Sequence, residues 1–176
     1  MKTYLEIQVP LRNDVAWFEE LRNICKNIDV RWQMGYYHIT MAFIDDTPIG
    51  VDFRPLLEKH FRTFAAPTLT FDKLDAFTAT SGMHIIYLTA TDIPQSFMSL
   101  VQSIRSDLKT AGCVMNSEFR LHVTLGRVKD PNVQLPTLHK LLETINVPAS
   151  SMTLTDVDYR VFRSGTIYET RLSVDK

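Results

Sequence analysis

The sequence predicts an α+β fold built from two related lobes. Segments with strand-like and helix-like patterns alternate at short spacing along all 176 residues. Each half of the chain contains the order strand, helix, strand, and the second strand of each half carries a His-x-Thr sequence. This recurrence indicates an internal duplication. Its natural consequence is a pair of lobes related by a pseudo-twofold axis, each contributing one His-x-Thr strand.

The first half begins with an alternating apolar and polar segment that ends at Pro10, which cannot continue a strand interior. The apolar residues that follow recur at intervals of three and four, which is typical of an amphipathic helix, and Asn13 or Asp14 is the expected N-cap. The residues Asp45–Pro48 have turn composition. We expect strands over 4–9, 36–44 and 69–77, and helices over 14–28 and 52–64.

The second half repeats this order. Apolar residues on one face of the segment 92–111 predict a helix, and Gly112 is suited to end it. We expect a further helix over 137–144 and strands over 83–91, 120–128, 152–162 and 167–174.

The composition excludes several classes of protein. Lys and Arg total 19 and Asp and Glu total 20, so a long nucleic-acid duplex is an unfavourable partner, whereas a small anionic ligand needs only a local site. The two cysteines, Cys25 and Cys113, are interpreted as free thiols in a reducing compartment. No apolar run approaches the roughly 20 residues that cross a bilayer. We expect a cytoplasmic monomer, without membrane association, whose residues 1–176 form a single bilobal domain.

The first His-x-Thr strand places its polar residues on one face. Side chains alternate along a strand, so His38, Thr40 and Ala42 of the segment HITMAF share a face, while Ile39, Met41 and Phe43 form the buried face. The polar face then opens into a cleft. Ala42 is small on that face, which leaves space for a ligand.

The second strand repeats the pattern 84 positions later (122 − 38) in the segment HVTLGR. His122, Thr124 and Gly126 are expected on its open face, and Gly126 is again small. Tyr36 and Arg120 stand two positions before each histidine, and therefore on the same face, as candidate wall residues.

Two histidines at one cleft are suited to general acid–base catalysis, because imidazole has a pKa near 6.5 and one ring can be neutral while the other is protonated. Threonine hydroxyls and a protonated imidazole can offset the charge of a phosphoryl group. A single His-x-Thr strand is usually structural, but two copies at equivalent places argue against accident. A metal site is not expected: the sequence has no His-Glu-x-x-His or Cys-x-x-Cys motif, and Asp45 and Asp46 have no counterpart in the second half.

The segments HITMAF and HVTLGR resemble the two-histidine phosphoesterase superfamily, particularly the branch of RNA 2′,3′-cyclic phosphodiesterases and 2′-5′ RNA ligases. Trp32, the strand-like segment 69–77 and the sequence Gly165-x-x-Tyr168 are similar to further elements of that family. A serine often found upstream of this glycine is not evident, which concerns the nucleotide pocket more than the chemistry.

The resemblance implies an antiparallel sheet with flanking helices in each lobe and a central cleft. It also implies metal-independent hydrolysis, without a cofactor, of 2′,3′-cyclic phosphate RNA ends or of a related small cyclic or 2′-5′ phosphodiester. His38 and His122 would be the general base and general acid, in either assignment, and Thr40 and Thr124 would hold the non-bridging oxygens. A non-catalytic RNA-end or nucleotide-binding module on the same scaffold is the alternative function.

Two more residues are candidates for substrate contact. Arg127 occupies a position where the family often has a basic residue, but strand alternation places it on the face away from the histidines, so a structural salt bridge is an equal expectation. Tyr168 is expected either to stack on a base or to pack in the sheet.

Overall fold

The computed structural model describes residues 1–174 and confirms the α+β class. The helices are α1 (Ala16–Ile24), α2 (Arg54–Phe61), α3 (Gln95–Thr110) and α4 (Leu135–Glu143). The strands are β1 (Thr3–Val9), β2 (Val30–Trp32), β3 (Tyr37–Ile44), β4 (Thr68–Phe71), β5 (Lys73–Thr78), β6 (His84–Thr89), β7 (Val123–Val128), β8 (Ser150–Thr153), β9 (Asp156–Val161) and β10 (Thr166–Arg171).

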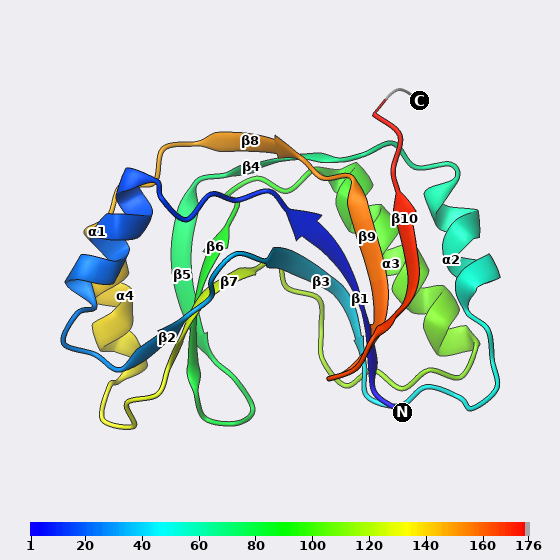
Figure 1. Cartoon of the computed structure of the whole chain (residues 1–176), viewed down its shortest axis with the longest axis horizontal. Helices are drawn as coiled ribbons and strands as arrows, with labels where there is room; N and C mark the ends of the chain where they lie inside the picture. The colour runs from blue at the N-terminus through cyan, green and yellow to red at the C-terminus, as the bar shows by residue number, and fades with distance from the viewer. Residues whose placement is uncertain (175–176) are drawn as a thin grey trace.

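The strands form two antiparallel lobes that meet in one sheet of order β10-β9-β1-β3-β7-β6-β5, and β2 pairs with β7 beside this path. One lobe holds β1, β3, β9 and β10 and is covered by α2 and α3 (Figure 1). The other holds β2, β5, β6 and β7, with α1 and α4 on its outer side. A ribbon of β4 and β8 runs across the top of both. The lobes therefore interleave the two halves of the chain.

Four features differ from the sequence-based expectation. The segment 69–77 divides into β4 and β5 at Asp72, whose Oδ1 accepts hydrogen bonds from the Thr91 amide and hydroxyl at 2.8 and 3.1 Å. The segment 152–162 likewise divides into β8 and β9, and the three-residue strand β2 was not predicted. The N-cap of α1 is Val15, because the Asp14 carboxylate is instead paired with Arg12 at 2.7 Å.

Apolar side chains of both lobes belong to one cluster of buried residues. Phe18 and Leu21 on α1 are fully buried, as are Phe97 and Ile104 on α3. These are the positions at which apolar residues recur at intervals of three and four, so the helical periodicity determines which face of each helix is buried.

Both His-x-Thr strands contain a β-bulge one residue after the threonine. In β3, Thr40 pairs with Glu6 and Ala42 pairs with Leu5, so Met41 has no partner on β1. In β7, Thr124 pairs with Tyr87 and Gly126 pairs with Ile86, so Leu125 has none on β6. Each bulge reverses the alternation of side chains for the rest of its strand.

This reversal corrects the predicted faces of four residues. Ala42 is fully buried in the core and does not open space for a ligand. Gly126 is buried because β2 lies against it: a Cβ there would be 2.7 Å from Val30 Cγ1 and 2.8 Å from Trp32 Cε3. Phe43 and Arg127, expected on the opposite face, are half-buried and lie on the side of the histidines.

The close packing of Val30 and Trp32 against Gly126 leads to a testable prediction. Gly126→Ala should lower the free energy of unfolding by about 1–3 kcal/mol, because the added methyl group overlaps Val30 and Trp32. Urea denaturation should show a lower midpoint with an unchanged m-value. Gly165→Ala is the matched control, since a Cβ at Gly165 meets no atom within 4 Å. Equal midpoints for the two variants would contradict this packing of β2 against β7.

Candidate active site

The two His-x-Thr motifs meet where β3 pairs with β7. The paired residues are Ile39 and Val123, the central residue of each motif. Because the pairing is antiparallel, His38 lies beside Thr124 and Thr40 lies beside His122, at the roughly 5 Å separation of cross-strand neighbours. A single register thus brings all four predicted residues to one place.

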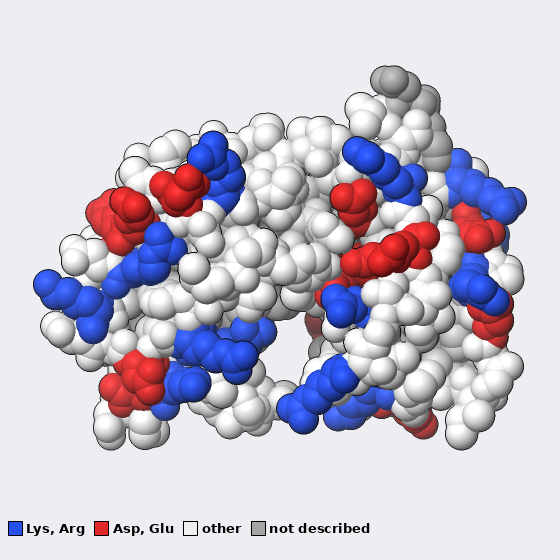
Figure 2. Space-filling model, in the orientation of Figure 1, with Lys and Arg blue, Asp and Glu red and all other residues white. Residues whose placement is uncertain are grey.

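A cavity of about 480 Å³ opens beside Thr40 and His122. Its walls come from Phe43 on β3, Phe77 and Thr78 on β5, the loop residues 79–80 and 117–120, and Arg105 on α3. The space-filling view shows a hollow between the lobes with Lys and Arg side chains on both of its sides (Figure 2). Neither threonine hydroxyl makes a hydrogen bond to any described residue, so both are available to a ligand.

His122 is held against an aromatic wall. Its Nδ1–H donates to the backbone carbonyl of Arg120 at 3.0 Å, and since a carbonyl can only accept, Nε2 of the neutral ring carries the free lone pair. The rings of Phe77 and Tyr87 meet the imidazole edge to face at 5.4 and 5.9 Å. Burial lowers the pKa of His122; the bond to the Arg120 carbonyl opposes this effect, while the charges of Arg120, His38 and Arg127 add to it.

His38 lies in a different environment, beside a buried carboxylate. Its Nε2 is 3.3 Å from Oε2 of Glu6, a side chain that is only 1% exposed. The hydroxyl of Tyr36 donates to Glu6 Oε1 at 2.7 Å and lies 3.2 Å from Asp158 Oδ2. Arg160 Nη1 is 3.5 Å from the same Glu6 oxygen. Glu6 Oε2 and His38 Nδ1 are buried without a hydrogen-bond partner among the described residues.

The pKa values on this side reflect burial. Burial, with smaller contributions from the charges of Arg127 and Arg160, lowers the pKa of His38 to about 4, and Asp158 opposes the shift. Burial raises the pKa of Glu6, although the Tyr36 hydroxyl and Arg160 act in the opposite direction. His38 is therefore neutral at neutral pH.

The surroundings of the two histidines differ at structurally equivalent positions. Glu6 is the β1 residue paired with Thr40, and Tyr87 is the β6 residue paired with Thr124. One histidine thus has a carboxylate neighbour and the other an aromatic one. The two duplicated motifs therefore have chemically different neighbours.

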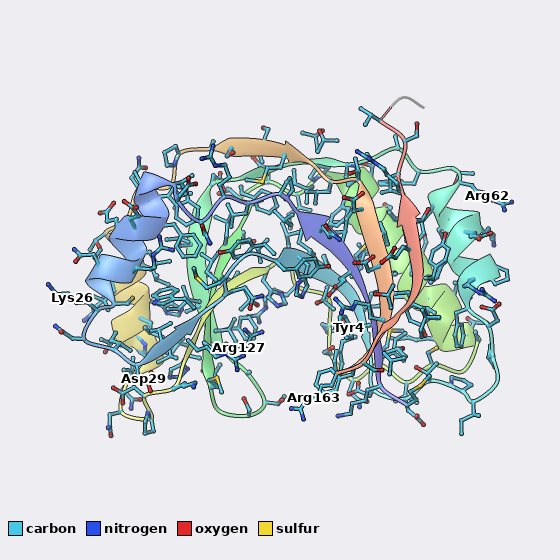
Figure 3. All side chains as sticks on the ribbon, in the orientation of Figure 1. Tyr4, Lys26, Asp29, Arg62, Arg127 and Arg163 are labelled. Atoms are coloured by element: carbon cyan, nitrogen blue, oxygen red, sulfur yellow. The ribbon has the colours of Figure 1, made fainter. Side chains whose placement is uncertain are left out.

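Arg127 faces the histidines, which corrects the expectation that it points away. The β-bulge at Leu125 places it on their side, where its charge acts on both His38 and His122. Figure 3 shows it projecting from β7 toward the hollow, with Tyr4 and Arg163 on the opposite side. Its Nη1 donates to Gln33 Oε1 at 3.3 Å, and it forms no ion pair with a described residue.

The three remaining predicted residues lie in different places. The guanidinium of Arg120 lies over the Phe77 ring at 4.2 Å and lines the cavity. Tyr36 lies against the His38 ring at 5.3 Å, but its hydroxyl is engaged by two carboxylates. Tyr168 is not brought to the cavity: it packs against the core and borders a surface depression with Phe61 of α2.

Sequence reasoning missed the residues that surround the motifs, namely Glu6, Asp158 and Arg160 near His38, and Phe77, Tyr87 and Arg105 near His122. The one signal available was an acidic residue, Glu6, within an otherwise largely apolar strand. The others come from β5, β6, β9 and α3, which only the tertiary structure brings to the site.

Comparison with known proteins identifies the family of this chain. The profile of the 2′-5′ RNA ligase superfamily matches residues 10–164. The chain belongs to this superfamily of two-histidine phosphoesterases. A search of curated protein sequences found no match.

Solved structures of the superfamily's fold cover nearly the whole chain. E. coli LigT complexed with NADP+ is 16% identical, with a TM-score of 0.59 over 98% of this chain and 97% of that one. The protein TT0787 of Thermus thermophilus is 14% identical, with a TM-score of 0.60 and full coverage of both chains. Kluyveromyces marxianus Usb1 is 10% identical, with a TM-score of 0.60 over 97% of this chain and 98% of that one. At these identities the likeness establishes the fold.

Two further observations concern residues 1–174. No group of three or more His, Cys, Asp or Glu side chains in this range is arranged to hold a metal ion. No helix in the same range combines the length and apolar character needed to cross a membrane.

The network around Glu6 makes a testable prediction. Tyr36→Phe should lower the free energy of unfolding by about 1–3 kcal/mol, because the buried carboxylate of Glu6 loses its closest donor. Urea denaturation measures the change. Tyr168→Phe is the matched control, since the Tyr168 hydroxyl makes no hydrogen bond to a described residue. If both variants unfold like the wild type, the Tyr36–Glu6 bond does not stabilise the site.

Proposed function

We propose that this protein is a metal-independent phosphodiesterase that hydrolyses 2′,3′-cyclic phosphate RNA ends, or a related small cyclic or 2′-5′ phosphodiester, by acid–base catalysis with His38 and His122. The observation that carries the proposal is the pairing of Ile39 with Val123, which juxtaposes two histidines and two free threonine hydroxyls. Membership of the two-histidine phosphoesterases supports the same chemistry.

The reaction needs two proton transfers on opposite sides of phosphorus. One imidazole takes a proton from water, whose oxygen forms a bond to phosphorus while the bond from phosphorus to one ribose oxygen breaks. The second imidazole, as its protonated form, gives its proton to that leaving oxygen. Thr40 and Thr124 donate hydrogen bonds to the non-bridging oxygens, and Arg127 offsets their charge. The expected product of an RNA end is a 2′-phosphate.

The environments favour His38 as the general base. Burial and nearby cations lower the pKa of both rings, that of His38 to about 4, so we assign His38 as the base, whose neutral form accepts a proton. His122 then acts as the general acid through Nε2, the nitrogen that is left free by the bond from Nδ1 to the Arg120 carbonyl. A substrate with sulfur in place of the leaving ribose oxygen tests this assignment, because a thiolate leaves without a proton. His122→Ala should then lose much less activity than on the oxygen substrate, whereas His38→Ala should lose as much.

A nucleotide-binding module is the second candidate. E. coli LigT has been solved with NADP+ and with 3′-AMP, and the free threonines and Arg127 of this chain could hold a phosphate without turnover. Catalysis is favoured over binding alone, because the pairing of β3 with β7 brings two intact histidines together.

The central prediction is turnover in EDTA of an oligonucleotide that ends in a 2′,3′-cyclic phosphate. His38→Ala and His122→Ala should each lower kcat by about 10²–10⁴, the contribution of a positioned acid or base. Product formation is followed by chromatography of the 2′-phosphorylated end. His60→Gln is the control, because His60 pairs with Asp107 outside the cavity. Wild-type binding of the oligonucleotide without turnover would favour the module instead.

The pH dependence follows from the lowered pKa values. The base must be neutral, which for His38 requires a pH above its pKa of about 4. The acid must be protonated, which for His122 requires a pH below its own pKa, and burial lowers that pKa below 6.5. The plot of kcat/KM against pH should therefore be a bell with its maximum below pH 6.5. A profile that continues to rise above neutral pH would contradict the two-histidine mechanism.

A further inference from the structure

A buried arginine beside the catalytic pair has no acidic partner. Arg105 on α3 is 8% exposed and lines the cavity that contains Thr40 and His122. Its guanidinium donates to two backbone carbonyls, those of Met41 and Ser117. No carboxylate of a described residue lies within ion-pair distance of it, and Glu118, the acidic residue that acts on its charge, is exposed to solvent.

Arg105 contacts β3, the strand that carries His38 and Thr40. Met41, whose carbonyl it contacts at 3.4 Å, is the bulged residue that directly follows Thr40. The guanidinium is therefore held at the wall of the cavity, next to the strand that carries Thr40. Arginine keeps its charge at all relevant pH values, and a buried charge is costly unless a counter-charge accompanies it. A ligand anion in the cavity would supply that counter-charge.

A second arginine faces the same cavity. Arg120 lies over Phe77, which holds its guanidinium in place, and it forms no ion pair with a described residue. Thr80 and Ser117 also line this space. A cavity of about 480 Å³ falls in the range of small-molecule sites, so it can hold part of a nucleotide in addition to one phosphate.

We infer that Arg105 and Arg120 form a subsite for a second phosphate group of the substrate, carried on the 5′ side of the nucleotide whose cyclic phosphate reacts. The inference rests on the proposed function and narrows its substrate class. Nucleotides with both a 2′,3′-cyclic phosphate and a 5′-phosphate are preferred over nucleoside cyclic monophosphates. A free 5′-monophosphate and the phosphodiester of an RNA chain share this chemistry.

Equilibrium binding of two product-like ligands tests the subsite without requiring turnover. Isothermal titration calorimetry compares adenosine 2′-monophosphate with adenosine 2′,5′-bisphosphate on the wild-type protein. The bisphosphate should bind at least about 10-fold more tightly, since charge-assisted arginine–phosphate bonds are among the strong hydrogen bonds of proteins. Equal dissociation constants, or no binding of either ligand, would overturn the inference.

Variants assign the effect to the arginines. Arg105→Gln and Arg120→Gln should each reduce the ratio of the two dissociation constants, and Arg105→Lys should keep part of it because the charge remains. Arg171→Gln, on the exposed outer strand β10, should keep the wild-type ratio. Unfolding midpoints show whether Arg105→Gln is folded, and Arg105→Lys and Arg120→Gln are measured in any case. An unchanged ratio in a folded Arg105→Gln and in Arg120→Gln would exclude the subsite.

A kinetic comparison separates this inference from the proposed function. The substrates are adenosine 2′,3′-cyclic phosphate, its 5′-phosphorylated form and an adenylyl dinucleotide with the same cyclic end. A higher kcat/KM for the last two supports the subsite, and their relative values distinguish a free monophosphate from a chain. Equal turnover of all three would refute the subsite and leave the reaction standing. Tighter binding of the bisphosphate without turnover of any substrate would refute the reaction and leave the subsite.

Discussion

The pairing of Ile39 with Val123 is the contact on which the site depends. It joins the two lobes at the centres of both His-x-Thr motifs, so one antiparallel register sets each histidine beside the threonine of the other motif. A shift of one residue would turn every side chain of a motif to the wrong face. In each strand a bulge, at Met41 or Leu125, lies two residues after this pair. The bulges turn Phe43 and Arg127 to the face that the histidines occupy.

The duplicated scaffold supports two different environments. Equivalent positions hold a buried carboxylate, Glu6, next to His38 and an aromatic ring, Tyr87, next to His122. In the proposed mechanism one imidazole accepts a proton while the other gives one up, and their different neighbours mean that the two rings need not titrate alike. Acid–base catalysis requires that inequality, because two rings with the same protonation state could not divide the two transfers.

The charge of the site also departs from the charge of the whole chain. The formal net charge is −1, yet Arg105, Arg120 and Arg127 all lie around the histidines without a carboxylate partner among the described residues. A local surplus of guanidinium groups suits a small anionic substrate, for which the total charge is irrelevant. The proposed phosphodiesterase activity uses Arg127, and the inferred subsite uses the other two, so both conclusions draw on the same uneven distribution of charge.

The sequence by itself determined the α+β class, the order of most elements and the four residues of the two motifs, because these follow from period-two and period-3.6 patterns within short segments. Only the tertiary structure decided which side chains reach the motifs. Local alternation placed Arg127 on the wrong face, since a bulge depends on the partner strand, and it placed Ala42 and Gly126 in a cleft although the core and β2 cover them. Glu6, Phe77 and Arg105 join the site from three other elements, and pairing between strands or packing of a helix on a sheet fixes their positions. Such contacts link residues far apart in the chain, and no local pattern encodes them.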